Sequence, residues 1–375
     1  MATPIQILCP HLTPYNDFLF RKIAEAHPQV RVRYRNKALG SHPWQSNLGE
    51  GYQLDYERRA LGIDWQTLAL AFTSGRTFFL VAGWDSLTML VMLSLLRLFG
   101  RSYAIWTDTP NPDRRGNWLK ERLRSAWLRW ILAGAKGCLG TGSTGVAGLR
   151  KMGAPERTLV TFPFVLDLDL YRRGPRGSEA SRPMRFVSSG RVQNWLKGHD
   201  VAVKAFMRIA SSDSMNFEYF VAGTGPDKEA LERLVQEADL ASKIKFLGWV
   251  EPGDLQRLLK ESDVVIHPSP VPDPFPNAVL EGMAAGCAVL GSSVCGSVVD
   301  RVVEGVSGFV HAPGDVQQLE GHIRSCILDP VRVAKMGDAA AATAERWPSA
   351  RAVAIVCELA EGRFPSLANT PWPAK

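Results

Sequence analysis

Short apolar runs alternate with helix-forming stretches along most of the chain, and this alternation limits the fold more than any other feature. The expected strands are Ile5–Cys9, Val30–Tyr34, Thr77–Ala82, Tyr103–Trp106, Gly137–Thr141, Arg185–Ser188, Phe217–Ala222, Ile244–Phe246, Val264–His267, Ala288–Leu290 and Gly308–Val310. The expected helices include Asp17–Ala26, Ser86–Phe99, residues 117–133, Val316–Cys326, Val331–Glu345 and Ala350–Gly362. Strands that alternate with helices form parallel sheets with helices on both faces. The pattern predicts an α/β chain with doubly wound, Rossmann-like sheets.

One interruption of this alternation indicates two domains. Residues 161–173 lack a regular pattern, and residues 174–183 (GPRGSEASRP) have the composition of a linker. A length of 375 residues also favours two domains. We predict a first domain over residues 1–173, a linker over 174–183, a second domain over 184–345, and a helix and tail over 346–375. The carboxyl ends of both sheets are expected to face a ligand cleft.

The charge of the chain is unevenly distributed. Residues 1–175 hold 23 Lys and Arg against 13 Asp and Glu, whereas residues 176–375 hold 21 against 24. The net charge of +7 therefore comes from the first half. We expect this half to meet an anionic membrane surface or a phosphorylated acceptor rather than a nucleic acid.

Other sequence features predict a cytoplasmic chain without a metal site. The six cysteines show no CxxC spacing, and neither they nor the seven histidines form a zinc motif. The first residues, MATPIQILCPHLTP, are typical of a first strand rather than a signal peptide. The most apolar run, Leu87–Phe99, is shorter than the about 20 residues that a membrane span needs.

The segment Pro268–Ser293 (PSPVPDPFPNAVLEGMAAGCAVLGSS) combines several functional groups. Asp273 and Glu281 lie eight residues apart, and Pro274 and Pro276 keep the turn between them irregular. The helix that follows should begin with amides that have no partner inside it, those of Asn277, Ala278 and Val279. Such amides bind phosphate oxygens, and carboxylates accept from sugar hydroxyls. The alternative is an ordinary strand–turn–helix unit with two solvated carboxylates.

Two cations follow the first strand of the second domain. Gly190 permits a tight turn, and Arg191 and Lys197 come next on the loop that leaves the sheet. A bidentate Arg and a point-charge Lys suit a diphosphate. The alternative is a pair of solvated surface cations.

Glycines end two further strands. In VAGTGP, Gly223 and Gly225 would let the backbone approach a ligand closely. Lys228 stands where a dinucleotide-binding motif would have its third glycine, which disfavours a hydride-transferring enzyme. Gly248 and Trp249 are a candidate edge for a nucleobase, with a plain strand-end turn as the alternative.

In this order and spacing, the motifs resemble the retaining glycosyltransferases of the GT-B fold, family 4. The ordered set comprises Gly190-Arg191…Lys197-Gly198, VAGTGP, FLGWV, DVVIHPSP, and Asp273-x7-Glu281 with GMAAGCAV. Gly153–Val160, Pro163…Asp167…Tyr171 and Arg346–Ser349 resemble the family's approach to the linker and its C-terminal segment. The resemblance implies two Rossmann-like domains and a terminal helix that crosses back to the first.

The resemblance also implies roles for the site residues. Arg191 and Lys197 would neutralise the donor diphosphate, Glu281 would bind the ribose hydroxyls, and Asp273 would contact the transferred sugar. The sugar and phosphate would also meet the backbone of Phe275, Pro276, Asn277, Ala278 and Val279. Preorganised cations and amides stabilise a departing diphosphate without a metal ion.

The chain departs from the family pattern at two side chains and one loop. Thr107 stands where many members have His, and Asp108 is expected to take over a contact to the acceptor or the sugar. Asp273 replaces the usual Glu and is one methylene shorter. The loop Pro10–Asn16 lacks the paired glycines common in the family.

The helix expected at residues 117–133 carries an apolar stripe. The stripe consists of Trp118, Leu119, Leu123, Trp127 and Trp130, and cations flank it, among them Lys120, Arg122, Arg124 and Arg129. Such a helix can lie in a membrane interface. It can equally pack its stripe on the sheet and leave the cations solvated.

These features together predict a retaining, metal-independent glycosyltransferase that needs no cofactor beyond its donor, a UDP-, GDP- or ADP-sugar. The acceptor would be a glycan or lipid-linked chain in cell-envelope glycan, lipopolysaccharide or exopolysaccharide synthesis. Two alternatives stay open here: a GT-B-fold epimerase or phosphorylase, and a non-catalytic protein that binds a nucleotide sugar.

Overall fold

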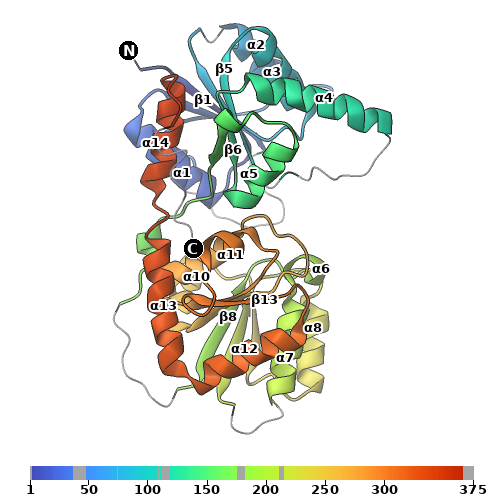
Figure 1. Cartoon of the computed structure of the whole chain (residues 1–375), viewed down its shortest axis with the longest axis vertical. Helices are drawn as coiled ribbons and strands as arrows, with labels where there is room; N and C mark the ends of the chain where they lie inside the picture. Colours follow the sequence, from blue (N-terminus) through green and yellow to red (C-terminus); the bar gives the residue numbers. More distant parts are fainter. Residues whose placement is uncertain are drawn as a thin grey trace. The chain divides into compact units, whose positions relative to one another are not determined.

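Two compact units make up the chain (Figure 1). The computed structural model describes residues 2–36, 48–73, 75–108, 110, 118–174, 182–210 and 215–365. The first unit holds the chain up to Leu166 and resumes at Ser349, and the second holds Asp167–Pro348. Each unit is built on one parallel sheet, so the predicted α/β, doubly wound fold is confirmed.

The first unit contains a seven-stranded sheet of order β3-β2-β1-β4-β5-β6-β7. Its strands are β1 (Ile5–His11), β2 (Val30–Asn36), β3 (Gln53–Tyr56), β4 (Phe78–Ala82), β5 (Ser102–Thr107), β6 (Gly137–Gly140) and β7 (Leu159–Thr161). Its helices are α1 (Pro14–Ala26), α2 (Trp65–Thr73), α3 (Leu87–Leu98), α4 (Trp118–Gly134), α5 (Gly142–Lys151), the 3₁₀ turn η1 (Glu156–Thr158) and α14 (Ser349–Ala360). Strands such as β4 are apolar throughout because helices cover both faces of the sheet.

The second unit contains a six-stranded sheet of order β10-β9-β8-β11-β12-β13. Its strands are β8 (Met184–Ser189), β9 (Phe217–Ala222), β10 (Ile244–Gly248), β11 (Val264–His267), β12 (Ala288–Ser292) and β13 (Gly308–His311). Its helices are η2 (Leu168–Leu170), α6 (Asn194–Lys197), α7 (His199–Ala210), α8 (Lys228–Glu237), α9 (Pro252–Glu261), α10 (Asn277–Ala284), α11 (Gly296–Arg301), α12 (Val316–Leu328) and α13 (Pro330–Ala344). The ring of Phe206 on α7 stacks on Tyr219 at 4.5 Å, which anchors the helix to the sheet.

The C-terminal helix α14 belongs to the first unit, although the chain reaches it from the second. It packs on α1 and β4, and Figure 1 shows it beside α1. Its buried side chains include Ile355, Val356 and Leu359. The helix therefore crosses back to the first unit, as the resemblance implied.

The chain joins the second unit earlier than the boundary expected at residue 173. Turn η2 packs on α10, and the Tyr171 hydroxyl donates a hydrogen bond to Glu281 at 3.2 Å. These contacts attach the residues after Leu166 to the second unit rather than to the first.

Helix α4 packs on the first unit through its C-terminal half alone. Its buried side chains are Leu128, Ile131 and Leu132, and Figure 1 shows the helix extending beyond the other helices of its unit. The predicted stripe is largely exposed: Trp118 is 71% exposed, Leu119 50%, Leu123 65% and Trp130 37%. The interpretation that this stripe packs on the sheet is therefore wrong for these four residues. In the described part of the chain, no helix has the length and apolar character of a membrane span.

Candidate functional site

The main site residues lie where the order of the second sheet reverses. Strands β8 and β11 are neighbours, but the sheet continues from β8 through β9 and from β11 through β12. Loops that leave such a pair diverge, and ligands of open α/β sheets bind at the carboxyl ends of these strands. Lys197 follows β8, and Asp273 and α10 follow β11.

Lys197 and Asp273 form a buried ion pair with two further partners. The Lys197 ammonium lies 2.6 Å from Asp273 Oδ2. His267 Nε2 lies 2.8 Å from the same oxygen, and Ser269 Oγ donates to it at 3.2 Å. Asp273 is 5% exposed and His267 3%. The four side chains form one network that fixes the position of the ammonium.

The charges of this network follow from burial and from its contacts. Burial raises the pKa of Asp273, but hydrogen bonds from His267 and Lys197, together with the positive charges that both carry in acid, outweigh it and hold that pKa well below the ordinary range. Burial lowers the pKa of His267 despite the neighbouring carboxylate. At neutral pH the network therefore holds one anion, one cation and a neutral imidazole that donates from Nε2.

Gly198 explains why Lys197 reaches Asp273. It ends α6 in the left-handed region, with φ of 68°, and a Cβ there would lie 2.2 Å from the Pro268 carbonyl oxygen. The loop after β8 thus packs directly on the loop after β11. The sequence motif contained Gly198, but its spacing gave no sign of this contact.

Gly223 and Gly225 allow the loop after β9 to pack closely against the loop after β8. A Cβ on Gly223 would lie 1.8 Å from the Gly190 carbonyl oxygen, and one on Gly225 would lie 2.1 Å from that of Val192. The neighbouring loop fills the space beside both glycines, and the approach of their backbone to a ligand stays a prediction. Gly190 itself has φ of 137° and a Cβ position with open space around it.

Gly248 and Trp249 end β10. No atom lies within 4 Å of a Cβ built on Gly248, whose φ is 68°. The Trp249 indole donates to Glu251 at 2.9 Å, which orients the ring beside this open backbone. The arrangement leaves room for a planar group, and the nucleobase role stays a prediction.

Helix α10 begins at Asn277 without a side-chain cap. Pro276 is the N-cap residue, and its side chain offers no acceptor to the first turn. The first amides, those of Asn277, Ala278 and Val279, therefore point toward the loop with the positive end of the helix dipole. Phe275, just before them, is 3% exposed.

Glu281 lies one turn into α10 and is 3% exposed. It accepts the hydrogen bond from Tyr171 described above. Sequence reasoning gave Tyr171 no role in the site, because the residue lies 110 positions away in an irregular segment. His267 and Ser269 were also missed, although both lie in the DVVIHPSP motif.

Arg191 and Asp108 lie outside this network. Arg191 is exposed, and within the described residues its guanidinium forms no ion pair. Asp108 is exposed and directly follows β5 in the first unit. Their predicted roles in binding the diphosphate and the acceptor stay predictions.

The carboxyl edge of the first sheet holds a polar cluster of its own. Arg35, at the end of β2, pairs with Asp85 after β4, with Nη1 and Oδ2 2.9 Å apart. Asn36 Nδ2 lies 3.3 Å from His11 Nδ1 at the end of β1. Burial, together with the charge of Arg35, lowers the pKa of His11. Sequence reasoning did not single out these residues.

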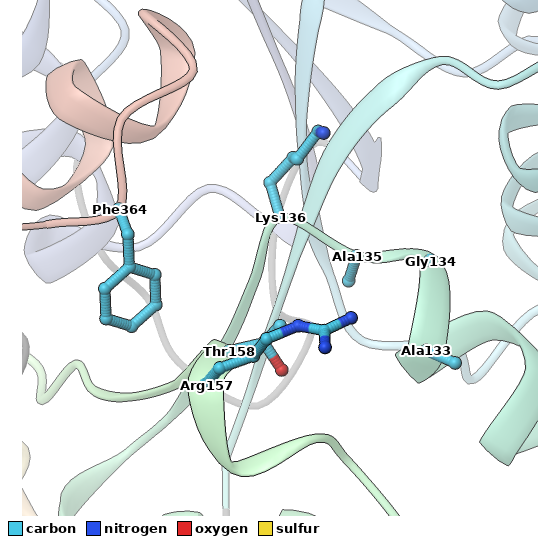
Figure 2. A pocket seen from close by; sticks show the side chains of 7 residues that line it. All are labelled: Ala133, Gly134, Ala135, Lys136, Arg157, Thr158 and Phe364. Carbon is cyan, nitrogen blue, oxygen red and sulfur yellow. The ribbon is translucent and has the colours of Figure 1, made fainter.

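A cavity of about 520 Å³ lies elsewhere in the first unit (Figure 2). Lys136 precedes β6 and Thr158 precedes β7, so the cavity borders the amino edge of the sheet. Arg157 and Phe364 also line it. Ligands of this fold class bind at the opposite edge, and across the described residues no three His, Cys, Asp or Glu side chains gather as a metal site.

Comparisons with known proteins find similarity to glycosyltransferases. Residues 176–343 match the family model described as glycosyl transferases group 1. A 2-deoxystreptamine glucosyltransferase of Streptomyces kanamyceticus is 27% identical over 242 residues, 61% of this chain and 60% of that protein. The amylovoran biosynthesis glycosyltransferase AmsK of Erwinia amylovora is 30% identical over 143 residues, 37% and 34% of the two chains. The matched segment thus spans less than two thirds of the length of each of these relatives.

Solved structures show the same fold over nearly the whole chain. Anabaena Alr3699/HepE in complex with UDP has a TM-score of 0.76 at 17% identity and covers 96% of this chain and 100% of its own. The lipopolysaccharide outer core galactosyltransferase WaaB has a TM-score of 0.69 at 14% identity, with 96% and 99% covered. The chain therefore has the GT-B fold, and the family match falls on residues 176–343, within its second unit.

Proposed function

We propose that the chain transfers a sugar from a nucleoside-diphosphate sugar to an acceptor hydroxyl. The observation that carries this proposal is the Lys197–Asp273 pair beside the uncapped start of α10, at the carboxyl edge of a glycosyl transferases group 1 domain. A fixed ammonium and a row of helix amides are complementary to a diphosphate. The descriptions of solved neighbours with UDP and with UDP-glucose support a nucleotide-sugar donor.

In the proposed reaction the bond between the anomeric carbon and the diphosphate breaks while the acceptor oxygen bonds to that carbon. The acceptor proton passes to the departing phosphate, and configuration is retained, as in the family 4 enzymes that the motifs resemble. Lys197, Arg191 and the α10 amides stabilise the negative charge that develops, without a metal ion. Glu281 binds the ribose hydroxyls.

Asp273 holds Lys197 in place before the donor arrives. Since its Oδ2 already accepts from three side chains, a sugar hydroxyl would have to reach its other oxygen. We therefore assign Asp273 two tasks, to orient the ammonium and to contact the transferred sugar.

The proposed acceptor is a glycan or lipid-linked chain of the cell envelope. Relatives named for amylovoran and colanic acid biosynthesis, and a neighbour named for the lipopolysaccharide outer core, support this class. The exposed Trp118, Leu119 and Leu123, flanked by cations, support peripheral binding to an anionic membrane from the cytoplasmic side.

Titration of the protein with UDP, GDP and ADP, followed by transfer assays with sugars of the base that binds, tests the proposal. Lys197→Ala and Glu281→Ala should each abolish transfer while the protein stays folded. Lys204→Ala is the matched control, since Lys204 pairs with Asp200 at 2.8 Å on the neighbouring helix and is half exposed. Unchanged turnover in both site variants would refute the proposal.

The same assays separate the alternatives. An epimerase would convert the nucleotide sugar without an acceptor, and a phosphorylase would need orthophosphate as its only co-substrate. A non-catalytic protein would bind the donor and neither transfer nor hydrolyse it.

A further inference from the structure

Helix α11 contacts the residues that carry the proposed donor site. We call residues 273–277 the donor turn, because they join Asp273 to the start of α10. The Gly296 amide donates to the Asp273 carbonyl at 3.0 Å, and Ser297 Oγ donates to the Pro276 carbonyl at 2.8 Å. Both ends of the donor turn are thus bonded to the first turn of α11.

The last residue of α11, Arg301, reaches the middle of the donor turn. Its guanidinium carbon lies 4.3 Å from the ring centre of Phe275 and 4.5 Å from that of Trp347. The Arg301 side chain also donates to Ser297 Oγ at 3.4 Å. Arg301 and Trp347 are each 1% exposed, and Phe275 is 3% exposed.

A guanidinium suits this position for a physical reason. It is planar, so it can lie against two aromatic rings at once, and the attraction between cation and ring is strongest where water is excluded. A lysine would keep the charge but lose the planar contact. Burial lowers the pKa of Arg301 to about 9, so the side chain is charged at neutral pH.

We infer that Arg301 is a positioning residue that fixes the donor turn by holding Phe275 against Trp347. Phe275 lies two residues from Asp273 and two from Asn277. A displaced Phe275 would therefore move both the carboxylate that holds Lys197 and the amides that open α10. Trp347 lies just before Ser349, where the chain enters the first unit, so the same contact ties the donor turn to the end of the second unit.

Hydrogen exchange of the ligand-free protein tests this inference without reference to any donor. In Arg301→Met and Arg301→Lys, the amides of residues 277–284 should exchange about tenfold faster than in the original protein. Those of β9 (Phe217–Ala222) should be unchanged. Arg301→Lys serves as the milder variant if Arg301→Met does not fold.

Two control variants separate a local effect from general destabilisation. Arg332→Met removes another cation from an aromatic face, since Arg332 lies 5.0 Å from the Phe309 ring in the same unit. Ile323→Ala empties part of the core on α12. Neither should speed exchange in residues 277–284 selectively. Unchanged exchange there in both Arg301 variants, or faster exchange spread evenly over the unit, would overturn the inference.

Donor binding supplies a second readout, which rests on the proposed function. The nucleoside diphosphate that binds the original protein should bind Arg301→Lys about tenfold more weakly. The KM for the donor should rise while the KM for the acceptor stays the same. If UDP, GDP and ADP all fail to bind the original protein, the proposed function fails, and the exchange experiment still decides the role of Arg301.

Discussion

Two cationic regions of the molecule differ in how their charges are held. In the second unit, Lys197 and Asp273 pair at 2.6 Å with side chains 19% and 7% exposed. On α4 of the first unit, Arg124 and Glu121 pair at 3.2 Å with side chains 32% and 30% exposed. Water and salt screen exposed pairs, whereas a buried pair leaves an uncompensated charge when one partner is lost.

Under the proposed function, this difference suits two kinds of partner. A network that fixes one ammonium suits recognition of one phosphate group in one orientation. A helix with several exposed cations beside exposed Trp and Leu suits attraction to a surface, where the sum of the charges matters more than the place of each. If the two regions differ in this way, the same chemical change should cost more stability in the second unit than on α4.

The largest effect is expected when the same chemical change is made in both ion pairs. Asp273→Asn should lower the free energy of unfolding by about 3 kcal/mol, because Lys197 then stays mostly buried without a counter-ion. Glu121→Gln should change it by less than about 0.5 kcal/mol. Urea denaturation followed by circular dichroism measures both, and losses of equal size would show that the two regions do not differ in this way.

Gly198→Ala should have the next largest effect and lower the free energy of unfolding by about 2 kcal/mol. The substitution combines backbone strain with a collision at the Pro268 carbonyl oxygen. Gly314→Ala is the matched control: its φ of 74° is similar to the 68° of Gly198, but no atom lies within 4 Å of its Cβ position. It should lose only the strain, about 1 kcal/mol. Thermal unfolding compares the two. Equal losses would mean that the close approach of the two loops adds nothing.

This glycine also shows how far the sequence could predict the site. The strand ends, Lys197, Asp273 and the start of α10 were readable from local patterns, since each depends on a few neighbouring residues. The pairing of Lys197 with Asp273 joins residues 76 positions apart and depends on how two loops pack. No local pattern distinguishes a buried Arg301 from a solvated one, so its role could not be predicted.

The fold was predictable to a similar extent. Strands buried on both faces, such as Val264–His267, stand out as apolar runs and were predicted with the bounds observed for β11. Strand β3 is four residues long with alternating partial exposure, and β7 has three residues, so neither forms a clear run. Helix α5 begins with GSTG, a poor helix-forming sequence, and its packing on β6 and β7 stabilises it instead.

Acidification should produce the third effect, to which His267 of the second unit's network contributes. Folded His267 has a pKa below the value of about 6.5 in an unfolded chain, so the unfolded state takes up a proton first as the pH falls. The stability that arises from this difference in the pKa of His267 is fully present above pH 6.5. It is lost as the pH falls toward the pKa of folded His267. The titratable groups near His267 include Asp273, Lys197, His199 and His311. Burial lowers the pKa of His199 to about 4 and also lowers that of His311, so three histidines act in this window.

His267→Gln keeps a donor near Asp273 and removes the titration. Between pH 7 and pH 5.5 the variant should lose about 1 kcal/mol less stability than the original protein. The Asp273–Lys197 pair should contribute the same amount to the stability at both pH values. The pKa of folded Asp273 lies well below this range, so the contribution of the pair is lost only in stronger acid. Denaturation curves of both proteins at the two pH values measure this difference. If the free energy of unfolding changes equally with pH in both, groups other than His267 cause the loss of stability in acid.

The smallest effect on stability is expected on α4, where the effect on binding should be large. The triple variant Arg122→Glu, Arg124→Glu and Arg129→Glu should unfold within about 0.5 kcal/mol of the original protein, since these side chains lie at the surface. Its binding to vesicles of phosphatidylglycerol and phosphatidylcholine should weaken strongly, because each cation near an anionic surface contributes about 1 kcal/mol. Leu123→Ser tests whether the apolar stripe of α4 also contributes to vesicle binding, since the Leu123 side chain is 65% exposed. Binding of the original protein should fall with added salt and vanish on pure phosphatidylcholine. If the original protein does not bind the anionic vesicles at low salt, the membrane is not the partner of the α4 cations, and the two regions do not differ in their kind of partner.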